Sequence, residues 1–448
     1  MRSLLVALAA GAALAVVAAA PAGAGWSPPQ TLSRSHFFAL PIGLGQTRGD
    51  ALASWRWVDR PGVERVSMRP LGRPAPPART LPAHTVAGPV AYGWNRIIVA
   101  TAASGPDGAR LLVRFGAANG RFGRDVLVAR ARSIYDVRLV ANARGDAALG
   151  WLVSDGTPTV RAFASVRRRG AAFGRPILLG SGRIFRVSTA IGPDGAVLAA
   201  WSTRGGVVRT RTKSARDAAF APVDLLRSHP AHLATPQVAF DGGGGAWVAW
   251  SAQDHSPSGV FGDAFVQIAR RPPGATRFLP AQLLDRAAPS VHPLDVSLAI
   301  GADRIAIVAW MLRFVEADSG HAEVRVAQAD ALGTTRTDTL ASFALPEVDG
   351  HAISAARRHP SSSMTPAAAV LWTQGAKSEE RPAPLFASIR EPVAPGALPG
   401  WGAPEIVTPS AGVFGLHAGY SGSGDSLVAL YPRPLPSGRF VILQSTYR

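Results

Sequence analysis

The stretch Val187–Ser228, VSTAIGPDGAVLAAWSTRGGVVRTRTKSARDAAFAPVDLLRS, holds the pattern that the rest of the chain repeats. Its first apolar segment, Val187–Ile191, is followed by a Gly-Pro-Asp-Gly turn. The next segment, Ala196–Trp201, is apolar throughout, which is typical of a strand that is buried on both faces. Val207–Lys213 alternates apolar residues with Arg and Thr, which indicates one wet face. With Val223–Leu226 as a fourth segment, the stretch predicts four short strands joined by turns.

The second strand of this unit recurs along the whole chain at intervals of 46 to 62 residues. Counting the reference copy, eight segments end at Trp55, Thr101, Trp151, Trp201, Trp250, Trp310, Trp372 and Tyr431, with Thr in the Trp position of the second copy. Repeats of this length with four strands each are typical of a β-propeller. We predict an all-β propeller of eight four-stranded blades. Seven blades remain the alternative if the second unit packs irregularly, and a β-sandwich core also uses short strands.

The fourth strand recurs as a heptapeptide that begins with an aromatic residue. Its copies are Phe122–Val128, Phe173–Leu179, Phe220–Leu226, Phe278–Leu284 and Trp401–Val407. The eighth unit stops at Arg448 without one, whereas Trp26–Leu32, WSPPQTL, matches WGAPEIV at Trp401–Val407. We therefore predict that Trp26–Leu32 pairs with Arg439–Thr446 and closes the ring, which leaves no blade incomplete.

Residues 1–24 predict a secretory signal, with Arg2, an apolar run at Leu4–Ala20 and small residues before the expected cleavage site. We expect residues 25–448 to form a single propeller domain that is secreted or extracytoplasmic, with no membrane span after cleavage, and to be monomeric. The sequence contains no cysteine, which excludes disulfides and thiol chemistry. Burial and strand pairing must hold the fold together.

The formal net charge is +18, from 47 Lys and Arg against 29 Asp and Glu, and nearly all of the positive charge is arginine. Two interpretations stay open: attraction to polyanions such as acidic wall polymers, or general solubility with arginine-rich codon usage. The densest run is Arg167–Arg169, which we place at strand or turn ends. For an exported chain with dispersed charge, we expect no nucleic-acid partner.

Histidine is unevenly placed in the repeat. Eight of the ten histidines fall in blade-to-blade connections or in loops between second and third strands, which share one face of a propeller. The longer loops of units five to seven lie there too, with several acids. One hypothesis is a polar or metal site on this face; the other is that loops simply collect polar residues. Because no histidine pair has convincing ligand spacing, we predict no metal and no cofactor.

Arginines and aromatic residues also gather where innermost strands begin, as in Arg132–Asp136 and Arg183–Arg186. Arg can hold a carboxylate through two hydrogen bonds and aromatic rings can stack on sugars, but strand capping and packing between blades explain the same pattern. The candidate ligand-binding residues from both patterns are His229, His232, Asp254, His255, Asp263, His292, Glu316, Asp318, His321, Arg183 and Tyr135.

The repeat architecture resembles exported bacterial β-propellers of the broad sialidase-like group. The Asp-box turn of that group, Ser-x-Asp-x-Gly-x-Thr-Trp, is matched only in part by Gly192–Gly195 ahead of Trp201 and by Gly105–Gly108. Sialidases have six blades rather than eight, and Tyr135 lacks the paired Glu that the resemblance implies for a nucleophile. We carry over no catalytic residue.

Together these patterns predict a non-catalytic propeller that binds a glycan, a peptide or a cell-envelope protein through its long-loop face. The alternative is a carbohydrate-active, sialidase-like hydrolase with Asp254 or Asp263 paired with Glu316 or Asp318. Such a pair needs carboxyl groups about 5–10 Å apart. A third possibility is a passive part of an envelope assembly, for which a broad exposed apolar patch is expected.

Overall fold

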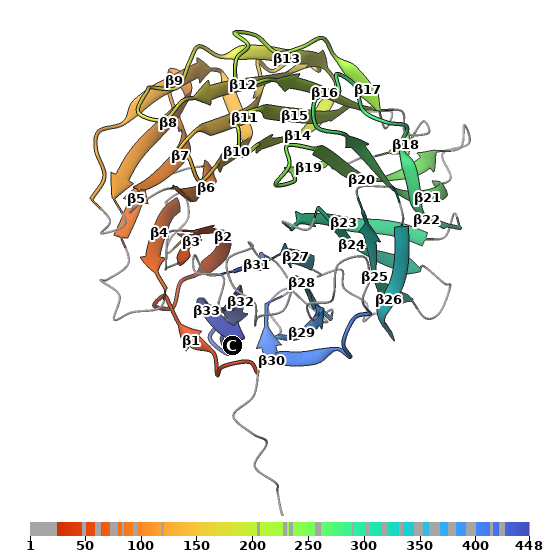
Figure 1. Ribbon diagram of the computed structural model, residues 1–448. Helices are drawn as coiled ribbons and strands as arrows, with labels where there is room; N and C mark the ends of the chain where they lie inside the picture. Colours follow the sequence, from red (N-terminus) through yellow and green to blue (C-terminus); the bar gives the residue numbers. More distant parts are fainter. Residues whose placement is uncertain are drawn as a thin grey trace, which may run out of the picture.

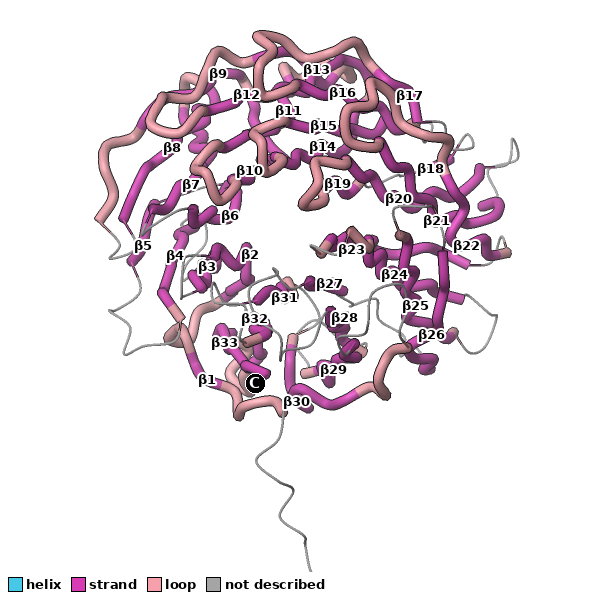
Figure 2. Tube along the Cα trace, in the orientation of Figure 1, coloured by secondary structure: helices cyan, strands magenta, loops and turns pink. Residues whose placement is uncertain are grey.

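The computed structural model shows a ring of antiparallel sheets (Figure 1). The strands of each sheet are joined by loops and turns, and no helix occurs among the described residues (Figure 2). The structure describes residues 25–46, 51–58, 64–71, 79–82, 85–92, 96–117, 121–203, 207–226, 231–232, 236–255, 261–288, 291–301, 304–314, 320–330, 333, 335–344, 353–357, 368–374, 382–390, 400–412, 415–420 and 426–447. The predicted signal, residues 1–24, lies outside them.

Eight sheets follow one another in chain order, and each is one blade with its first strand innermost. The first four blades are β2 (Phe38–Gln46), β3 (Ala51–Val58), β4 (Glu64–Pro70), β5 (Arg79–Pro82); β6 (Thr85–Tyr92), β7 (Arg96–Gly105), β8 (Gly108–Ala117), β9 (Val126–Ala131); β10 (Ser133–Ala141), β11 (Ala147–Ser154), β12 (Val160–Arg167), β13 (Ile177–Gly182); and β14 (Ile184–Ile191), β15 (Val197–Thr203), β16 (Val208–Lys213), β17 (Asp224–Leu226).

The last four are β18 (Ala231–His232), β19 (Gln237–Phe240), β20 (Ala246–His255), β21 (Phe261–Arg271), β22 (Gln282–Ala287); β23 (Val291–Ile300), β24 (Ala306–Phe314), β25 (His321–Ala329), β26 (Thr335–Ala344); β27 (Ile353–Arg357), β28 (Ala368–Thr373), β29 (Ala383–Arg390), β30 (Glu405–Ala411); and β31 (His417–Tyr420), β32 (Leu427–Pro434), β33 (Phe440–Tyr447), β1 (Gln30–Thr31). The prediction of eight blades is confirmed. In blade 5 the innermost strand is split, because β18 and β19 both pair with β20.

The second strands form the core because both of their faces are covered by neighbouring blades. The aromatic residues that mark the repeat are at most 1% exposed: Trp55, Trp151, Trp201, Trp250, Trp310, Trp372 and Tyr431. Thr101 takes the same place in blade 2 and is 7% exposed. One buried cluster joins β7 and β8 to β10 and β11, and another joins blade 6 to blade 7. The core is therefore a ring of apolar seams between blades.

The ring is closed by the N-terminal strand, as predicted. β1 pairs antiparallel with β33 through Gln30–Gln444 and Thr31–Leu443. Beyond the strand, the Leu32 N–H donates to the Ile442 carbonyl at 2.8 Å, and the Trp26 ring packs edge-on against Tyr447 at 5.5 Å. The first described residues and the last strand thus form the outer half of one blade.

Propeller topology gives the ring two different faces. The connections between second and third strands and those between blades lie on one face, which we call the loop face. The turns between first and second strands and the connections between third and fourth strands lie on the other, which we call the turn face.

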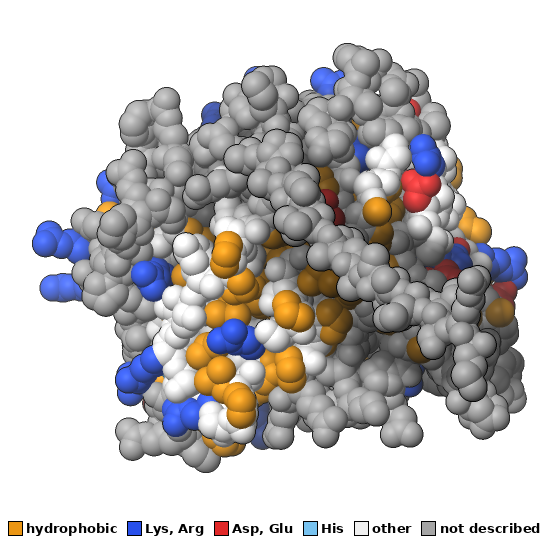
Figure 3. Space-filling model, turned by 90° about the horizontal axis from the view of Figure 1, so that it is seen from below, with side chains coloured by type: hydrophobic (Ala, Val, Ile, Leu, Met, Phe, Trp, Pro, Cys, Tyr) orange, Lys and Arg blue, Asp and Glu red, His pale blue; other side chains and the backbone are white. Residues whose placement is uncertain are grey.

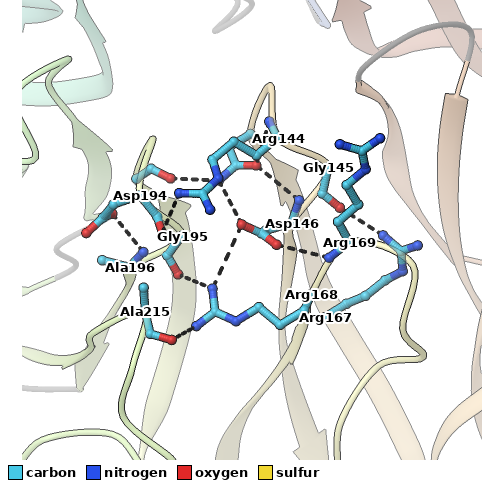
Figure 4. Close-up of polar contacts among 12 residues, drawn as sticks. Arg144, Gly145, Asp146, Arg167, Arg168, Arg169, Asp194, Gly195, Ala196 and Ala215 are labelled. Atoms are coloured by element: carbon cyan, nitrogen blue, oxygen red, sulfur yellow. Dashed lines mark hydrogen bonds and ion pairs between the residues drawn. The ribbon is translucent and has the colours of Figure 1, made fainter.

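On the turn face, arginines clasp neighbouring blades (Figure 4). Arg168 of blade 3 donates to the Gly195 carbonyl of blade 4 at 3.0 Å and lies 3.9 Å from Asp146, and Arg167 donates to the Gly145 carbonyl at 2.9 Å. The predicted position of this arginine run at a strand end is confirmed.

Gly195 fits this clasp for two reasons. Its φ of +89° lies in the left-handed region that glycine favours, and a Cβ there would collide with the Arg168 guanidinium. Part of the arginine content therefore serves inter-blade hydrogen bonding.

Candidate functional site

The candidate residues of blades 5 and 6 are only partly within the described structure. His229, Glu316 and Asp318 lie outside the described residues, so the proposed carboxylate pairs with Glu316 or Asp318 lie outside them too. For His232, His255 and His292 the backbone alone is described. Asp254, Asp263, His321, Arg183 and Tyr135 are described with their side chains.

Strand pairing brings several of these positions together at the seam between blades 5 and 6. His232 on β18 lies opposite Gln253, next to Asp254 on β20. The Gln253 amide donates to the Val291 carbonyl at 3.1 Å, so the start of β23, which holds His292, adjoins the same place. One carboxylate oxygen of Asp254 is buried without a hydrogen-bond partner. The described residues contain no group of three or more His, Asp and Glu side chains that could hold a metal ion.

Apart from Asp254, three described acids near this seam are held in ion pairs. Asp263 accepts a hydrogen bond from Arg286 at 2.7 Å within blade 5. Asp285 accepts from Arg325 of blade 6 through both carboxylate oxygens at 2.9 Å, and from the Trp310 indole N–H at 2.9 Å. The composition of the loops did not point to Asp285, which lies inside β22; only its contact across the seam identifies it.

His321 and Glu323 extend this network along β25. Glu323 binds Arg325 at 2.7 Å and lies 3.9 Å from the His321 imidazole. The His321 ring stacks on Phe314 with centroids 4.1 Å apart. His321 therefore packs at the base of the β24–β25 connection, and its position on the loop face agrees with the prediction.

Two aromatic groups at the start of innermost strands differ in their surroundings. In blade 1, His36 is 2% exposed and stacks on Trp57 at 4.4 Å, so it serves packing. In blade 4, Phe185 is 37% exposed and lies between the exposed residues Arg183 and Arg186. Neither guanidinium has a hydrogen bond or ion pair within the described part of the chain. This second group is available to a ligand.

A bulge at the start of β14 sets the direction of Phe185. Ile184 pairs with Thr203 and Arg186 with Ser202, so Phe185 is the extra residue. Bulges bend a strand and re-aim its side chains. The neighbouring β10 has a bulge as well, between Tyr135 and Arg138.

Asp136 sits in the β10 bulge and ties blade 3 to blade 4. Its φ of +47° is in the left-handed region, which Asp tolerates better than most residues. One carboxylate oxygen accepts from Arg138 at 2.9 Å, and the other accepts from the Val187 N–H at 2.7 Å.

Burial, and then the Asp136 charge, raise the pKa of the Tyr135 hydroxyl, which therefore stays protonated at neutral pH. We call Tyr135, Asp136, Arg138, Arg183, Phe185 and Arg186 the blade 3–4 cluster.

Arg138 also belongs to a set of residues at one level of the innermost strands. In each blade, this residue pairs with the second-strand residue just before the buried aromatic marker, or just before Thr101 in blade 2. The eight residues are Gly43, Ala87, Arg138, Ser188, Gln237, Ser297, Ser354 and His417. The Ser297 hydroxyl accepts from the Ala355 N–H of the next blade at 2.9 Å, and Ser354 accepts from Ala418 at 3.0 Å. The Ser297 and Ser354 hydroxyls thus satisfy backbone N–H groups on the inner edges of the blades, which strand pairing leaves open.

His417 makes the corresponding contact between blades 8 and 1, donating to the Pro41 carbonyl. Burial and, to a lesser extent, the Arg138 charge lower the pKa of His417 to about 4, against the opposing effect of the Pro41 hydrogen bond. Because the folded state holds a neutral imidazole, the unfolded state binds the proton first as pH falls below about 6.5.

We therefore expect stability to fall between about pH 6.5 and pH 4, by on the order of 2 kcal/mol from this group. Urea unfolding of the wild type and of His417→Gln at pH 7 and pH 4.5 measures this. The variant should lose less stability than the wild type over that interval; an equal loss would show that His417 does not carry the effect.

The outer rim shows a different surface. Hydrophobic side chains gather in the sector of β1 and β30 (Figure 3), where Pro28, Pro29, Pro404 and Ile406 are exposed. Separately, no helix among the described residues is long and apolar enough to cross a membrane.

No protein-family model matches the chain, and no curated protein matches it in sequence. Among solved structures, an ulvan lyase of a new polysaccharide lyase family is 8% identical, with a TM-score of 0.46 over 76% of this chain and 93% of that one. The Hadza microbial sialidase is 10% identical, with a TM-score of 0.37 over 93% and 94%. A Dyadobacter fermentans protein of unknown function is 12% identical, with a TM-score of 0.38 over 70% and 94%. The chain is an eight-bladed β-propeller whose structural neighbours include sialidases and other glycan-active propellers, and the likeness is one of fold.

Proposed function

We propose that this chain is an exported binding protein that recognises an acidic glycan with the blade 3–4 cluster on its loop face. The observation that carries the proposal is the exposed Phe185, flanked in the sequence by Arg183 and Arg186, whose exposed guanidinium groups make no hydrogen bond or ion pair in the described part of the chain. Export rests on the predicted signal in residues 1–24. Sequencing the N-terminus of protein recovered outside the cytoplasm tests that part, and an intact residue 1 would contradict it.

The chemistry of the cluster suits an acidic sugar. A guanidinium binds a carboxylate through two parallel hydrogen bonds, and an aromatic face packs on the apolar face of a sugar ring. Asp136 is already held by Arg138 and by the Val187 N–H, so it fixes the strand rather than acting as a proton donor. The Tyr135 hydroxyl offers one further hydrogen bond to a sugar hydroxyl. The cluster therefore supports binding.

Calorimetry with a uronic-acid oligosaccharide and a neutral oligosaccharide of equal length tests the proposal. We expect binding of the acidic ligand alone, weakened about tenfold or more in Phe185→Ala and in Arg186→Gln. Phe37→Ala is the matched control, because Phe37 is an exposed aromatic on the same face of blade 1, 61% exposed. Equal affinity for both ligands, or equal weakening by the control, would refute the assignment.

A hydrolase acting at the seam of blades 5 and 6 is the second candidate, and Asp254 favours it. One of its carboxylate oxygens is buried without a hydrogen-bond partner and is therefore open to a group of a bound substrate. Release of reducing ends from acidic and neutral polysaccharides, compared between the wild type and Asp254→Asn, separates the two functions. Release that disappears in Asp254→Asn establishes the hydrolase; binding without release establishes the binding protein.

A further inference from the structure

The turn face carries a series of exposed arginines that the clasps do not use. They occur on consecutive blades, from blade 2 to blade 6: Arg124, Arg169, Arg175, Arg216, Arg277 and Arg304. In the described part of the chain, none of these six guanidinium groups makes a hydrogen bond or an ion pair. Five lie in third-to-fourth strand connections, and Arg304 lies in the turn before β24.

Most described acids on this face are engaged elsewhere, whereas the exposed Asp217, which accepts from the Ser214 N–H at 3.2 Å, lies next to Arg216 in the sequence. Asp125 is bound by Arg114, and the buried Asp241 accepts from two backbone N–H groups and from the Trp247 indole. Asp146 accepts from the Arg169 backbone N–H at 3.0 Å, which leaves the Arg169 guanidinium free. The face therefore presents a surplus of positive charge.

Lys213, at the end of β16, lies on the same face. Burial lowers its pKa, and the charge of Arg168 lowers it further, against the opposing charge of Asp217. Among the charged neighbours of the Lys213 ammonium, Arg168 of the clasps repels it and Asp217 attracts it. An anion bound there would relieve that repulsion.

The arrangement suits a linear ligand rather than a compact one. Since the blades follow one another around the ring (Figure 1), the six arginines lie along an arc of the turn face instead of converging on one point. Arginine pairs with phosphate or sulfate through its planar fork. We propose that this arginine arc binds a linear polymer with regularly spaced phosphate or sulfate groups, independently of the ligand at the loop face.

Binding of inorganic polyphosphate and of dextran sulfate, measured over a range of salt concentrations, tests the proposal. The test variant replaces Arg169, Arg175, Arg216 and Arg277 by Gln. The control replaces Arg110, Arg130, Arg132 and Arg286 by Gln; these exposed residues lie on the loop face outside the blade 3–4 cluster, and their replacement removes the same charge. We expect the test variant to bind at least about tenfold more weakly, with a salt slope reduced by about 2 to 3, and the control to change less than about twofold.

Equal weakening in both variants would show that net charge alone drives binding and would overturn the arc. Absence of binding to either polymer would overturn it as well, as would equally tight binding of orthophosphate, because a single compact site would then suffice. The stronger of the two polymers identifies phosphate or sulfate as the preferred group. Calorimetry of the acidic oligosaccharide distinguishes the two faces: binding should weaken in Phe185→Ala and Arg186→Gln, and should stay unchanged in the variant that lacks the four turn-face arginines.

Discussion

Deletion of residues 25–33 is expected to abolish cooperative folding, or to lower the unfolding midpoint by more than about 10 °C. The deletion removes β1, leaves the outer edge of β33 unpaired and exposes the pocket that Leu32 fills, where it is 7% exposed. At about 1 kcal/mol for each lost hydrogen bond and about 2–3 kcal/mol for the leucine, the loss is comparable with the whole net stability of a domain. Thermal unfolding followed by circular dichroism measures it.

Three further variants keep this test independent of a simple failure to fold. Leu32→Ala should cost about 2–4 kcal/mol, whereas Thr31→Ala, at an exposed position of the same strand, should cost less than about 0.5 kcal/mol. Because Gln30 faces Gln444 across the closing pair and the chain has no cysteine, a Gln30→Cys, Gln444→Cys variant should form one disulfide on oxidation. An unchanged midpoint after the deletion would mean that the ring does not depend on its N-terminal strand.

Asp285→Ala is expected to lower the free energy of unfolding by about 2–3 kcal/mol, because it leaves the buried Trp310 indole N–H without its acceptor and the partly buried Arg325 guanidinium with Glu323 alone. Asp285 is 10% exposed in its side chain and serves both Arg325 and Trp310 across the seam of blades 5 and 6. Urea unfolding at neutral pH measures the loss. Asp285→Asn should cost less, since an amide oxygen still accepts one of these bonds.

Asp263→Ala is the matched control for this prediction. Asp263 also binds an arginine at the loop-face end of blade 5, but the side chain of its partner, Arg286, is 64% exposed. Because water can replace the lost carboxylate there, we expect a cost below about 1 kcal/mol. Equal losses in the two variants would show that the seam position of Asp285 does not matter.

The candidate site was predictable in part. The sequence marks Arg183 and Tyr135 because arginines and aromatic residues recur where innermost strands begin, and the structure places both in the blade 3–4 cluster. Phe185 and Arg186 belonged to the same pattern, but their availability depends on a bulge that no spacing reveals. Nothing in the sequence singles out Asp285, because an acid within an outer strand is usually exposed to solvent. Only its contacts across the seam identify it.

The fourth-strand heptapeptide likewise has features that the sequence predicts and features that only the structure reveals. Its sixth position is aliphatic in all five aromatic-led copies, and these residues are at least 45% exposed on the rim: Leu127, Leu178, Leu225, Leu283 and Ile406. The seventh position is equally aliphatic, yet Leu179, Leu226, Leu284 and Val407 are buried. Hydropathy does not separate the two positions, because both are apolar; the packing of one blade face against its neighbour does.

By itself, the sequence determined the strands, their grouping into eight units and the segment that completes the last unit. These features depend on local patterns: alternation of side chains along a strand, turn residues, and a repeat whose missing piece is visible at the other end. Only the tertiary structure decided which arginines form clasps between blades and which, on the turn face or beside Phe185, make no hydrogen bond or ion pair with the described residues. The physical reason is that an ion pair or a hydrogen bond between blades joins residues about 20 to 60 positions apart, as Arg168 joins Gly195 and Arg325 joins Asp285, and their proximity exists only once the ring has closed.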